Sequence, residues 1–348
     1  MTGLDDLSPS QRLDALRARG LLDPAQVAAL AGGVALPLAL ADGLVVDGDE
    51  VILPLASESP DLAPAVADAA RRCRGAGGVQ TDSTGTLMVG QVVLAGMAVP
   101  AAARAQVLAR RGELRGPCDA ADPALGAVGG GLRRVTAHLL HTDGDGPVLA
   151  VNLIVDTKDA MGARLVTAMA RAAAPHLESW TGGRAVLVGP ANRADHRLVR
   201  VRAAWPADDL GGADLRDALA LAGRLAGADP HQAATRNKEV MDGITAVLLA
   251  TGNDTRAAEA AAHAHAARRG GYVPLARWEV DGAGSLAGTL EVPVPAGIVG
   301  GATQALPAAR ACQSILRLRS ADHLSRIAAA VGLVAGFAAL RAAVARRG

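Results

Sequence analysis

The order of strand-like and helix-like segments between Leu87 and Val188 restricts the fold of this chain more than any other feature. Alternating apolar residues indicate strands, and apolar residues at helical spacing indicate helices. In chain order these segments are a strand (87–94), a helix (101–111), two strands (132–141 and 147–155), a helix (162–180) and a strand (184–188). The order βαββαβ is that of a ferredoxin-like split unit. We therefore predict a small ferredoxin-like domain at residues 87–198, inserted into a large domain built from residues 1–86 and 199–348.

The segments on either side of the insert predict an α+β fold for the large domain. Ser8-Pro9 and Asp23-Pro24 each place a proline where a helix starts, before expected helices at 11–19 and 25–31. Further helices are expected at 61–72, 215–226, 233–249 and 254–269, a strand at 45–55 and a β-hairpin at 275–294. Ser320 is a favoured first residue for the last helix. Its apolar run at 327–340 is shorter than the ~18 residues of a membrane span, so we expect a buried helix.

Charge and cysteine content argue against several classes of function. The 35 basic and 34 acidic residues leave a formal net charge of +1, so no broad basic surface for nucleic acid or an anionic membrane is expected. Cys73, Cys118 and Cys312 are widely spaced and form no C-x-x-C, which indicates neither a disulfide framework nor a metal site. The N-terminus carries acids where a signal peptide carries basic and apolar residues. A cytoplasmic protein with a small-molecule ligand or a protein partner is therefore expected.

The two lysines point to one pair of polar segments. Among the basic residues only Lys158 and Lys238 are lysines, and a buried lysine, unlike an arginine, can lose its proton. Lys238 follows Asn237, and Asp254 follows Asn253 on the far side of an apolar stretch. This spacing fits two helix ends with capping Asn and Asp. It also fits a catalytic lysine with a catalytic carboxylate.

Short strings over most of the chain resemble the class II (bacterial-type) hydroxymethylglutaryl-CoA reductase family. In chain order they are Asp159-Ala160-Met161-Gly162, Thr181-Gly182-Gly183, Asp229-Pro230, Asn237-Lys238, Ala250-Thr251-Gly252-Asn253-Asp254, Trp278-Glu279, Gly300-Gly301-Ala302-Thr303 and Ala330-Val331-Gly332-Leu333. The resemblance implies a large domain that binds an acyl-CoA thioester and an inserted ferredoxin-like domain that binds a nicotinamide cofactor. It also implies a homodimer or higher homo-oligomer in which two chains share each active site.

The resemblance implies roles for single residues as well. Reducing a thioester to an alcohol needs a donor to the carbonyl oxygen, a proton supply and protonation of the leaving thiolate. By position, Lys238 matches the family's donor lysine and Asp254 matches the aspartate that orients it. Asn237 stands beside the lysine and is placed with the catalytic residues. Thr235 lies in the string before them and is a substrate-binding candidate.

Several positions in the large domain and the end of the sequence depart from the family's pattern. Ser59 stands where the family has its catalytic glutamate, and Glu58 comes one residue earlier. Because neighbours on an extended segment point to opposite sides, we expect that Glu58 replaces this glutamate only after a shift of register. Gln232 stands for a substrate-binding arginine, and Asp242 stands for an asparagine. The family continues into a flap domain with the catalytic histidine, whereas the sequence ends at Gly348, so a divergent member without this flap is expected.

The expected cofactor site, for NADH or NADPH, centres on the string at 159–162. Asp159, Met161 and Gly162 match the family's dinucleotide loop, and Asn192 lies in a second, more altered string. The alternative for Asp159 and Gly162 is a turn with a helix cap. Arg164 replaces an asparagine of the family, and it either meets a phosphate, as in NADPH, or plugs the site.

These departures predict a repurposed enzyme of secondary metabolism. In this hypothesis Lys238 and Asp254 act on a carbonyl or thioester metabolite, without the full four-electron reduction of hydroxymethylglutaryl-CoA. Two alternatives stay open. The first is a non-catalytic binding or scaffold protein, because removal of several cooperating groups leaves little rate. The second is an authentic NAD(P)H-dependent hydroxymethylglutaryl-CoA reductase that makes mevalonate.

Overall fold

The computed structural model describes residues 11, 14, 17, 18, 36–143 and 145–345. Met1–Pro37 and Leu38–Gly348 are two separate compact units. Every strand discussed below belongs to the second unit, as does every helix whose bounds are given. The helices expected at 11–19 and 25–31 lie largely outside the described residues, so they stay predictions.

A six-stranded sheet, sheet A, forms the framework of the residues that flank the insert, with the strand order β2-β1-β3-β8-β10-β9. Its strands are β1 (Leu38–Val46), β2 (Asp49–Ala56), β3 (Val79–Ser83), β8 (Leu198–Trp205), β9 (Ala276–Val280) and β10 (Leu286–Pro293). The strand expected at 45–55 is instead two strands, because Asp47 and Gly48 have φ values of 51° and 90° and reverse the chain. The hairpin expected at 275–294 is confirmed as β9 and β10.

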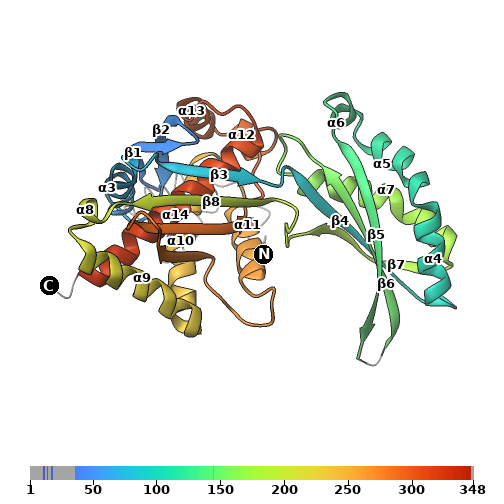
Figure 1. Cartoon of the computed structure of the whole chain (residues 1–348). Coiled ribbons are helices and arrows are strands. Elements are labelled where there is room, and N and C mark those ends of the chain that lie inside the picture. The colour runs from blue at the N-terminus through green and yellow to red at the C-terminus, as the bar shows by residue number, and fades with distance from the viewer. Residues whose placement is uncertain (1–10, 12–13, 15–16, 19–35, 144, 346–348) are drawn as a thin grey trace. The chain divides into compact units, whose positions relative to one another are not determined.

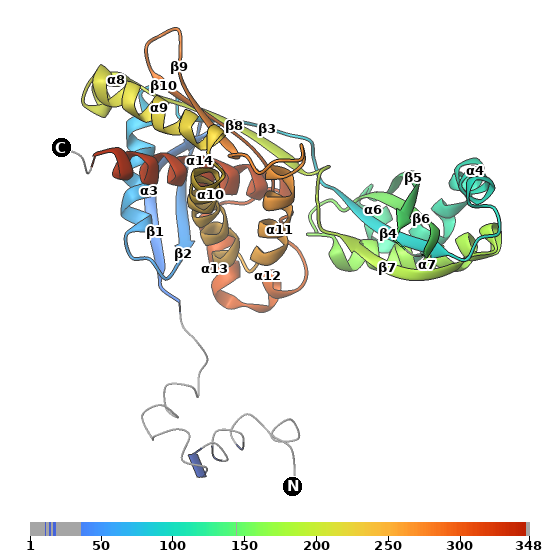
Figure 2. The same ribbon diagram turned by 90° about the horizontal axis from the view of Figure 1, so that it is seen from below.

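One long helix forms the centre of the large core. The helices of this part are α3 (Leu62–Arg74), α8 (Ala207–Leu210), α9 (Ala213–Ala228), α10 (Pro230–Ala250), α11 (Thr255–Ala266), α12 (Ala302–Ala305), α13 (Pro307–Ile315) and α14 (Ala321–Ala345). α14 contacts α3, α9, α10 and the sheet, as Figures 1 and 2 show. By length and composition α14 could cross a membrane, but 67% of its most apolar stretch is buried inside the protein. The predicted buried helix is therefore confirmed as the core helix of this fold.

Two glycines let α10 and α14 approach each other closely. A methyl group at Gly243 of α10 would lie 2.7 Å from the carbonyl oxygen of Val331 and 2.8 Å from Cβ of Ala335. A methyl group at Gly332 of α14 would lie 2.6 Å from the side chain of Ile244. The helices therefore cross backbone to backbone, which fixes the orientation of α10 in the core.

The insert forms a separate four-stranded antiparallel sheet, sheet B, with the order β5-β6-β4-β7. Its main elements are β4 (Leu87–Ala95), α4 (Pro100–Arg110), β5 (Gly131–Thr142), β6 (Asp145–Asp156), α7 (Ala163–Thr181) and β7 (Arg184–Ala191). The predicted order βαββαβ and its ferredoxin-like strand arrangement are therefore present. Three short helices that the pattern did not predict lie between α4 and β5, namely η2 (Arg111–Leu114), α5 (Arg115–Ala121) and α6 (Pro123–Ala127).

The chain leaves sheet A at the end of β3 and returns to it at the start of β8, and these two strands are antiparallel neighbours. Ser83 pairs with Val199, and the next residue, Thr84, donates its backbone N–H to the carbonyl oxygen of Leu198 over 2.9 Å. The two connections to the insert therefore run side by side.

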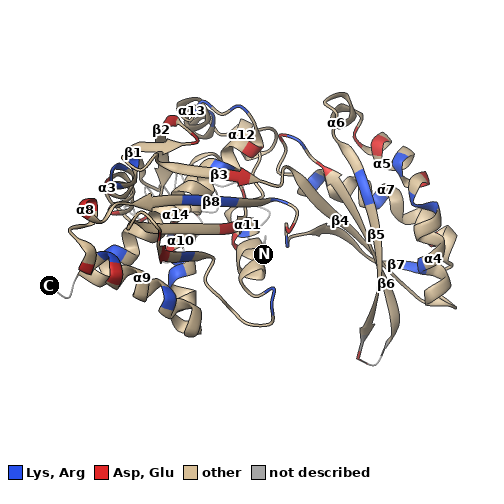
Figure 3. Cartoon of the chain, viewed as in Figure 1, with Lys and Arg blue, Asp and Glu red and all other residues tan. Residues whose placement is uncertain are grey.

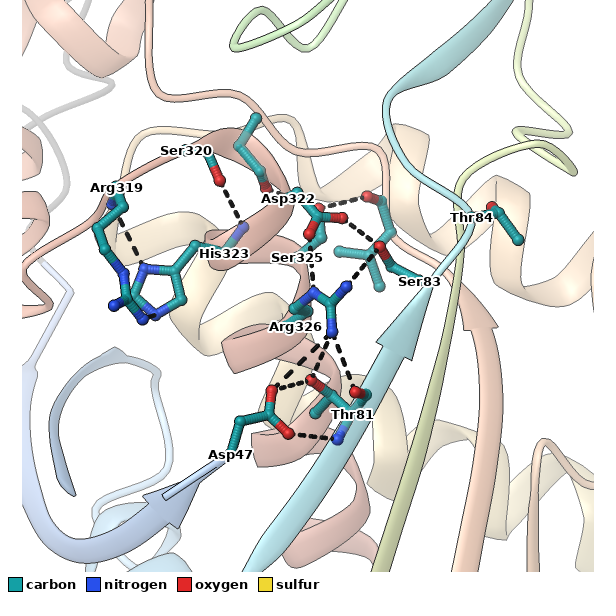
Figure 4. Close-up of polar contacts among 12 residues, drawn as sticks. Asp47, Thr81, Ser83, Thr84, Arg319, Ser320, Asp322, His323, Ser325 and Arg326 are labelled. Atoms are coloured by element: carbon teal, nitrogen blue, oxygen red, sulfur yellow. Dashed lines mark hydrogen bonds and ion pairs between the residues drawn. The ribbon is translucent and has the colours of Figure 1, made fainter. Parts of the chain in front are cut away.

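A polar network fixes the start of α14 against β3 (Figure 4). Arg326 donates to Asp322 (2.7 Å), to the carbonyl oxygen of Thr81 (3.0 Å) and to the hydroxyl of Ser83 (3.2 Å). The Ser320 hydroxyl accepts the backbone N–H of His323, so the predicted cap residue of the last helix is confirmed. Arginine can serve three acceptors at once because its guanidinium carries five N–H donors.

Candidate active site

The first half of α10 presents a polar stripe to solvent, and Lys238 lies on it. Asp229 caps the helix by accepting the backbone N–H of His231, and Pro230 occupies the first turn. Lys238 and Asp242 are one turn apart, and the Lys238 ammonium lies 2.7 Å from a carboxylate oxygen of Asp242. This hydrogen bond raises the pKa of Lys238, so the side chain stays cationic at neutral pH.

Glu58 lies on the same side of the molecule as Lys238. Its carboxylate adds to the rise in the pKa of Lys238, which requires that the two charges be close. β2 ends at Ala56 and the chain bends at Glu58, so strand alternation does not decide where Glu58 points, and its replacement of the family's glutamate stays a prediction. Ser59, at the family's catalytic position, is exposed, and its backbone N–H donates to the hydroxyl of Ser57.

Asn237 does not face this stripe, in contrast to its predicted catalytic place. Its side chain is fully buried; its amide donates to the carbonyl oxygen of Val273 (3.0 Å) and accepts the N–H of Leu275 (2.7 Å). A buried amide that satisfies both a backbone donor and a backbone acceptor stabilises a chain segment. Asn237 thus fixes the segment between α11 and β9.

The two predicted substrate-binding residues differ in position. At roughly 100° per residue, Thr235 projects about 60° from Lys238 around the helix, whereas Gln232 projects about 120° away. Both are exposed. The Thr235 hydroxyl donates to the carbonyl oxygen of His231, and it lies nearer to the Lys238 side of α10 than Gln232 does.

Glu239 is a titratable group that the sequence analysis missed. Burial raises the pKa of Glu239 to about 7, against the opposing charge of Arg236. The two side chains lie 2.9 Å apart and are mostly buried, but the contact lacks hydrogen-bond geometry. The sequence contains one sign of this group, which is that Glu239 directly precedes the apolar residues Val240 and Met241. A carboxyl that titrates near neutral pH is a usable proton donor, and its charge also acts on Lys238.

Asp254 lies beyond the C-terminal end of α10, whereas Lys238 lies in the first half of that helix. The helix rises about 18 Å between Lys238 and Ala250, at ~1.5 Å per residue. The N–H of Asn253 bonds to the carbonyl oxygen of Leu248, which keeps the following turn at that end. Asp254 caps α11 by accepting the N–H groups of Arg256 and Ala257. The predicted pairing of Asp254 with Lys238 is therefore wrong within one chain, where Asp242 pairs with the lysine.

The predicted cofactor loop is bonded to α14 and to the segments that precede β8 and follow β10. A side-chain oxygen of Asp159 accepts the N–H of Ala321, the first residue of α14, and its carbonyl oxygen accepts the N–H of Ile298. Arg197 is buried and donates to the carbonyl oxygens of Met161 (2.9 Å) and Ala296 (2.6 Å). Burial lowers the pKa of Arg197 to about 10. Asp159 thus caps a helix, as the alternative expectation had it, but that helix is α14.

Arg164 lies beside a cavity at the start of α7, and both of its expected roles stay predictions. Gly162 begins α7 at a φ of 107°, where a side chain would also meet Thr157 and Met88. Arg164, the second residue of α7, is exposed and lines a cavity of about 390 Å³ together with Thr167, Arg171 and Pro190. Neither arginine has a carboxylate within ion-pair distance among the described residues.

Asn192 is exposed in the turn that follows β7. It lies two residues after Pro190, which lines the same cavity. Asn192 therefore stays a candidate for the cofactor site on position alone. In the part of the chain that the structure describes, no group of three or more His, Cys, Asp or Glu side chains is arranged to hold a metal ion.

A sequence model of one family, described as "Hydroxymethylglutaryl-coenzyme A reductase", matches residues 24–347. The chain belongs to this family. It is 43% identical over 311 residues to the 3-hydroxy-3-methylglutaryl-coenzyme A reductase of Archaeoglobus fulgidus, covering 89% of this chain and 71% of that protein. It is 34% identical over 220 residues to the probable reductase of Borreliella burgdorferi, covering 62% of this chain and 50% of that protein.

Solved structures place the chain among the class II reductases. The Streptococcus pneumoniae class II enzyme bound to NADPH in open conformations is similar with a TM-score of 0.87 and 32% identity, covering 99% of both chains. A second structure of the S. pneumoniae reductase has a TM-score of 0.86 and 33% identity, covering 99% of this chain and 87% of that one. The fold expected from the family resemblance is therefore confirmed. The absence of the flap domain stays a prediction.

Proposed function

We propose that the chain is an authentic NAD(P)H-dependent 3-hydroxy-3-methylglutaryl-CoA reductase. The observation that carries the proposal is the ion pair of Lys238 and Asp242 on the solvent-facing side of α10, on which the charge of Glu58 also acts, in a chain 43% identical to a named reductase. This proposal replaces the repurposed enzyme as the favoured function. Its main support against repurposing is the 43% identity to a named reductase over 311 residues.

These residues have the charges that thioester reduction requires. Two hydrides and two protons convert the thioester of hydroxymethylglutaryl-CoA to the alcohol mevalonate and free CoA thiol. Negative charge develops on the carbonyl oxygen, and a fixed cation stabilises it. Lys238 stays protonated through its bond to Asp242, so it can donate to this oxygen. Glu58 and Glu239 are the carboxyl groups beside it that can hold and return protons.

Asp254 comes to the site from another copy of the chain in this proposal. Asp254 is separated from Lys238 by most of the length of α10, so the two residues act on one substrate only if they come from different chains. A homodimer with a two-fold axis makes such an arrangement twice, because each chain supplies Lys238 to one site and Asp254 to the other.

The start of α7 fits the phosphates of a nicotinamide dinucleotide. The N–H of Val166 is the first in α7 to bond within the helix, to the carbonyl oxygen of Gly162. The N–H groups of the preceding turn therefore remain available for an anion. Arg164 and Arg171 add two guanidinium groups beside the 390 Å³ cavity, which suits the additional phosphate of NADPH. When bound, the dinucleotide supplies the hydrides.

The direct test is oxidation of NADPH or NADH, followed by absorbance, with hydroxymethylglutaryl-CoA as substrate. We expect thioester-dependent oxidation in the wild type and a loss of at least a hundredfold in kcat for Lys238→Ala, as for removal of an oxyanion donor. Arg134→Ala, an exposed substitution on β5, serves as the matched control and should retain the wild-type rate. If the wild type oxidises neither nucleotide, with mevalonate absent from the products, the proposal is wrong.

Gln232 favours a second candidate function, which is the reduction of a different CoA thioester. An amide in place of a guanidinium cannot form the bidentate ion pair with a carboxylate, so the enzyme's substrate would be a CoA thioester without a distal carboxylate. Comparison of hydroxymethylglutaryl-CoA with 3-hydroxy-3-methylbutyryl-CoA in the same assay decides between the two. A kcat/KM at least tenfold higher for the second substrate would favour this candidate.

A further inference from the structure

A second cavity, of about 950 Å³, lies on the side of sheet A that carries Arg200 and Arg202. It is lined by residues of β3, β8, β9, β10 and α9, and by the segment between α11 and β9. Figure 3 shows basic positions along β8 at this place. No residue of the candidate active site lines this cavity, so the residues around Lys238 leave it unexplained.

One row of side chains crosses four strands in this cavity without an acidic residue. Gln80 of β3 is paired with Arg202 of β8, Arg202 with Thr289 of β10, and Thr289 with Arg277 of β9. All four residues line the cavity. Strands lie about 4.8 Å apart, so the backbones at Arg202 and Arg277 are about 10 Å apart, with Thr289 between them. Two arginines and a hydroxyl at this spacing can converge on one phosphate group.

The neighbouring row is neutralised by its own ion pairs. Arg200 lies 2.9 Å from Glu291 and 3.5 Å from Asp82, and Arg268 lies 3.2 Å from Glu291. By contrast, the arginines at positions 202, 224, 269 and 277 have no carboxylate within 4.0 Å among the described residues. The cavity contains six arginines and three carboxylates, a net charge of +3 in a chain whose formal net charge is only +1. The positive charge of the molecule is therefore concentrated here.

An apolar strip completes the cavity wall. Val273, Pro274 and Leu275 line it, and the buried side chain of Asn237 fixes this strip through the backbone of Val273 and Leu275. A rigid apolar strip beside unpaired arginines suits a ligand that has a flat apolar part and an anionic part. A volume of about 950 Å³ is at the upper end of the ~300 to 1,000 Å³ typical of ligand sites.

We propose that this cavity binds a nucleotide that carries at least two phosphate groups. Its phosphates contact Arg202, Arg277 and Thr289, and its base lies against the strip at 273–275. Arginine is suited to this role because its planar fork donates two parallel hydrogen bonds to one phosphate. The site can take free nucleotides or the nucleotide end of coenzyme A, since both present the same chemistry.

Calorimetric titration of the full chain tests the proposal with ATP, 3′,5′-ADP and coenzyme A as probes, and with adenosine and inorganic phosphate as partial ligands. We expect saturable binding of ATP and 3′,5′-ADP, binding of both partial ligands at least tenfold weaker, and weaker binding at higher salt. Saturation by coenzyme A with much weaker binding of ATP identifies the coenzyme as the source. The reverse order identifies a free nucleotide.

The double variant Arg202→Ala/Arg277→Ala should bind these probes at least tenfold more weakly. The control Arg134→Ala/Arg184→Ala removes the same charge from exposed strands of sheet B and should bind as the wild type does. Arg202→Lys/Arg277→Lys keeps the positive charge but loses the planar guanidinium, so its affinity for the probes should lie between those of the wild type and the alanine variant. Binding by this lysine variant would show that a loss in the alanine variant does not come from misfolding. Wild-type affinity in the alanine variant, or no saturable binding of any probe to the wild type, would overturn the proposal. Wild-type affinity in the alanine variant does not bear on the reductase assay, which reports on Lys238, whereas a failure of the wild type to bind coenzyme A would count against the reductase as well.

Discussion

Mixing two inactive variants, Lys238→Ala and Asp254→Ala, tests whether one active site is built from two chains. The structure supplies the reason for the experiment. Twelve helical residues separate Lys238 from Ala250, a rise of about 18 Å, whereas a lysine side chain reaches only about 6 Å from its backbone. Asp254 is held beyond that end of α10 by its cap of α11. A lysine and an aspartate of the same chain therefore cannot meet on one thioester.

The size of the effect follows from counting sites. If two chains contribute, a mixed dimer has one site with both residues intact and one site with neither. Random exchange of equal amounts makes about half of the dimers mixed, so the mixture should recover about 25% of wild-type activity. The assay is thioester-dependent NADPH oxidation after partial denaturation and refolding of the mixture, with each variant refolded alone as the control. Recovery of no activity, although mixed dimers form by native mass spectrometry, would refute the two-chain site.

Three further predictions follow from individual contacts. Asp242→Asn removes the carboxylate whose hydrogen bond raises the pKa of Lys238, so the alkaline limb of the kcat/KM profile should move to lower pH; an unmoved limb contradicts this role. Gly243→Ala places a methyl group 2.7 Å from a carbonyl oxygen of α14 and should lower the free energy of unfolding by about 1 to 3 kcal/mol in urea titration. Asp156→Asn should lower it by about 2 kcal/mol at neutral pH. Although burial opposes the shift, hydrogen bonds lower the pKa of Asp156 to about 2. Its contribution is therefore present above pH ~4 and is lost as the pH falls towards 2, and wild type and variant should converge there.

The insert was predictable because its pattern is local. Each strand and each helix of the insert has apolar residues at the spacing of its own type, and few folds are compatible with the order βαββαβ. In sheet A the sequence analysis missed β3 and β8. Val199, Val201, Ala203 and Trp205 alternate towards the core, a signal that was present but not used. β3 has only five residues and one fully buried side chain, so its pattern is too short to find.

The sequence allowed residues of the candidate site to be identified, but it did not show which residues they contact. Lys238 was found because lysine is rare in this chain, whereas Arg197 is one of many arginines and its burial leaves no mark in the sequence. The bond between Asp159 and Ala321 joins positions far apart in the chain, and the partner of Lys238 depends on the direction and length of α10. Spacing along the chain cannot show that Lys238 lies in the first half of α10 and that Asp254 lies beyond the far end of this helix.

The side-by-side connections of the insert have a thermodynamic consequence for folding. Were residues 84–198 unfolded, they would form a loop of about 115 residues between β3 and β8, and closing such a loop costs about 4 kcal/mol by chain entropy. A folded insert holds its two ends together at Thr84 and Leu198, which removes most of this cost. Damage to the core of the insert should therefore weaken the distant pairing of β3 with β8, and the two sheets should unfold as linked rather than independent units.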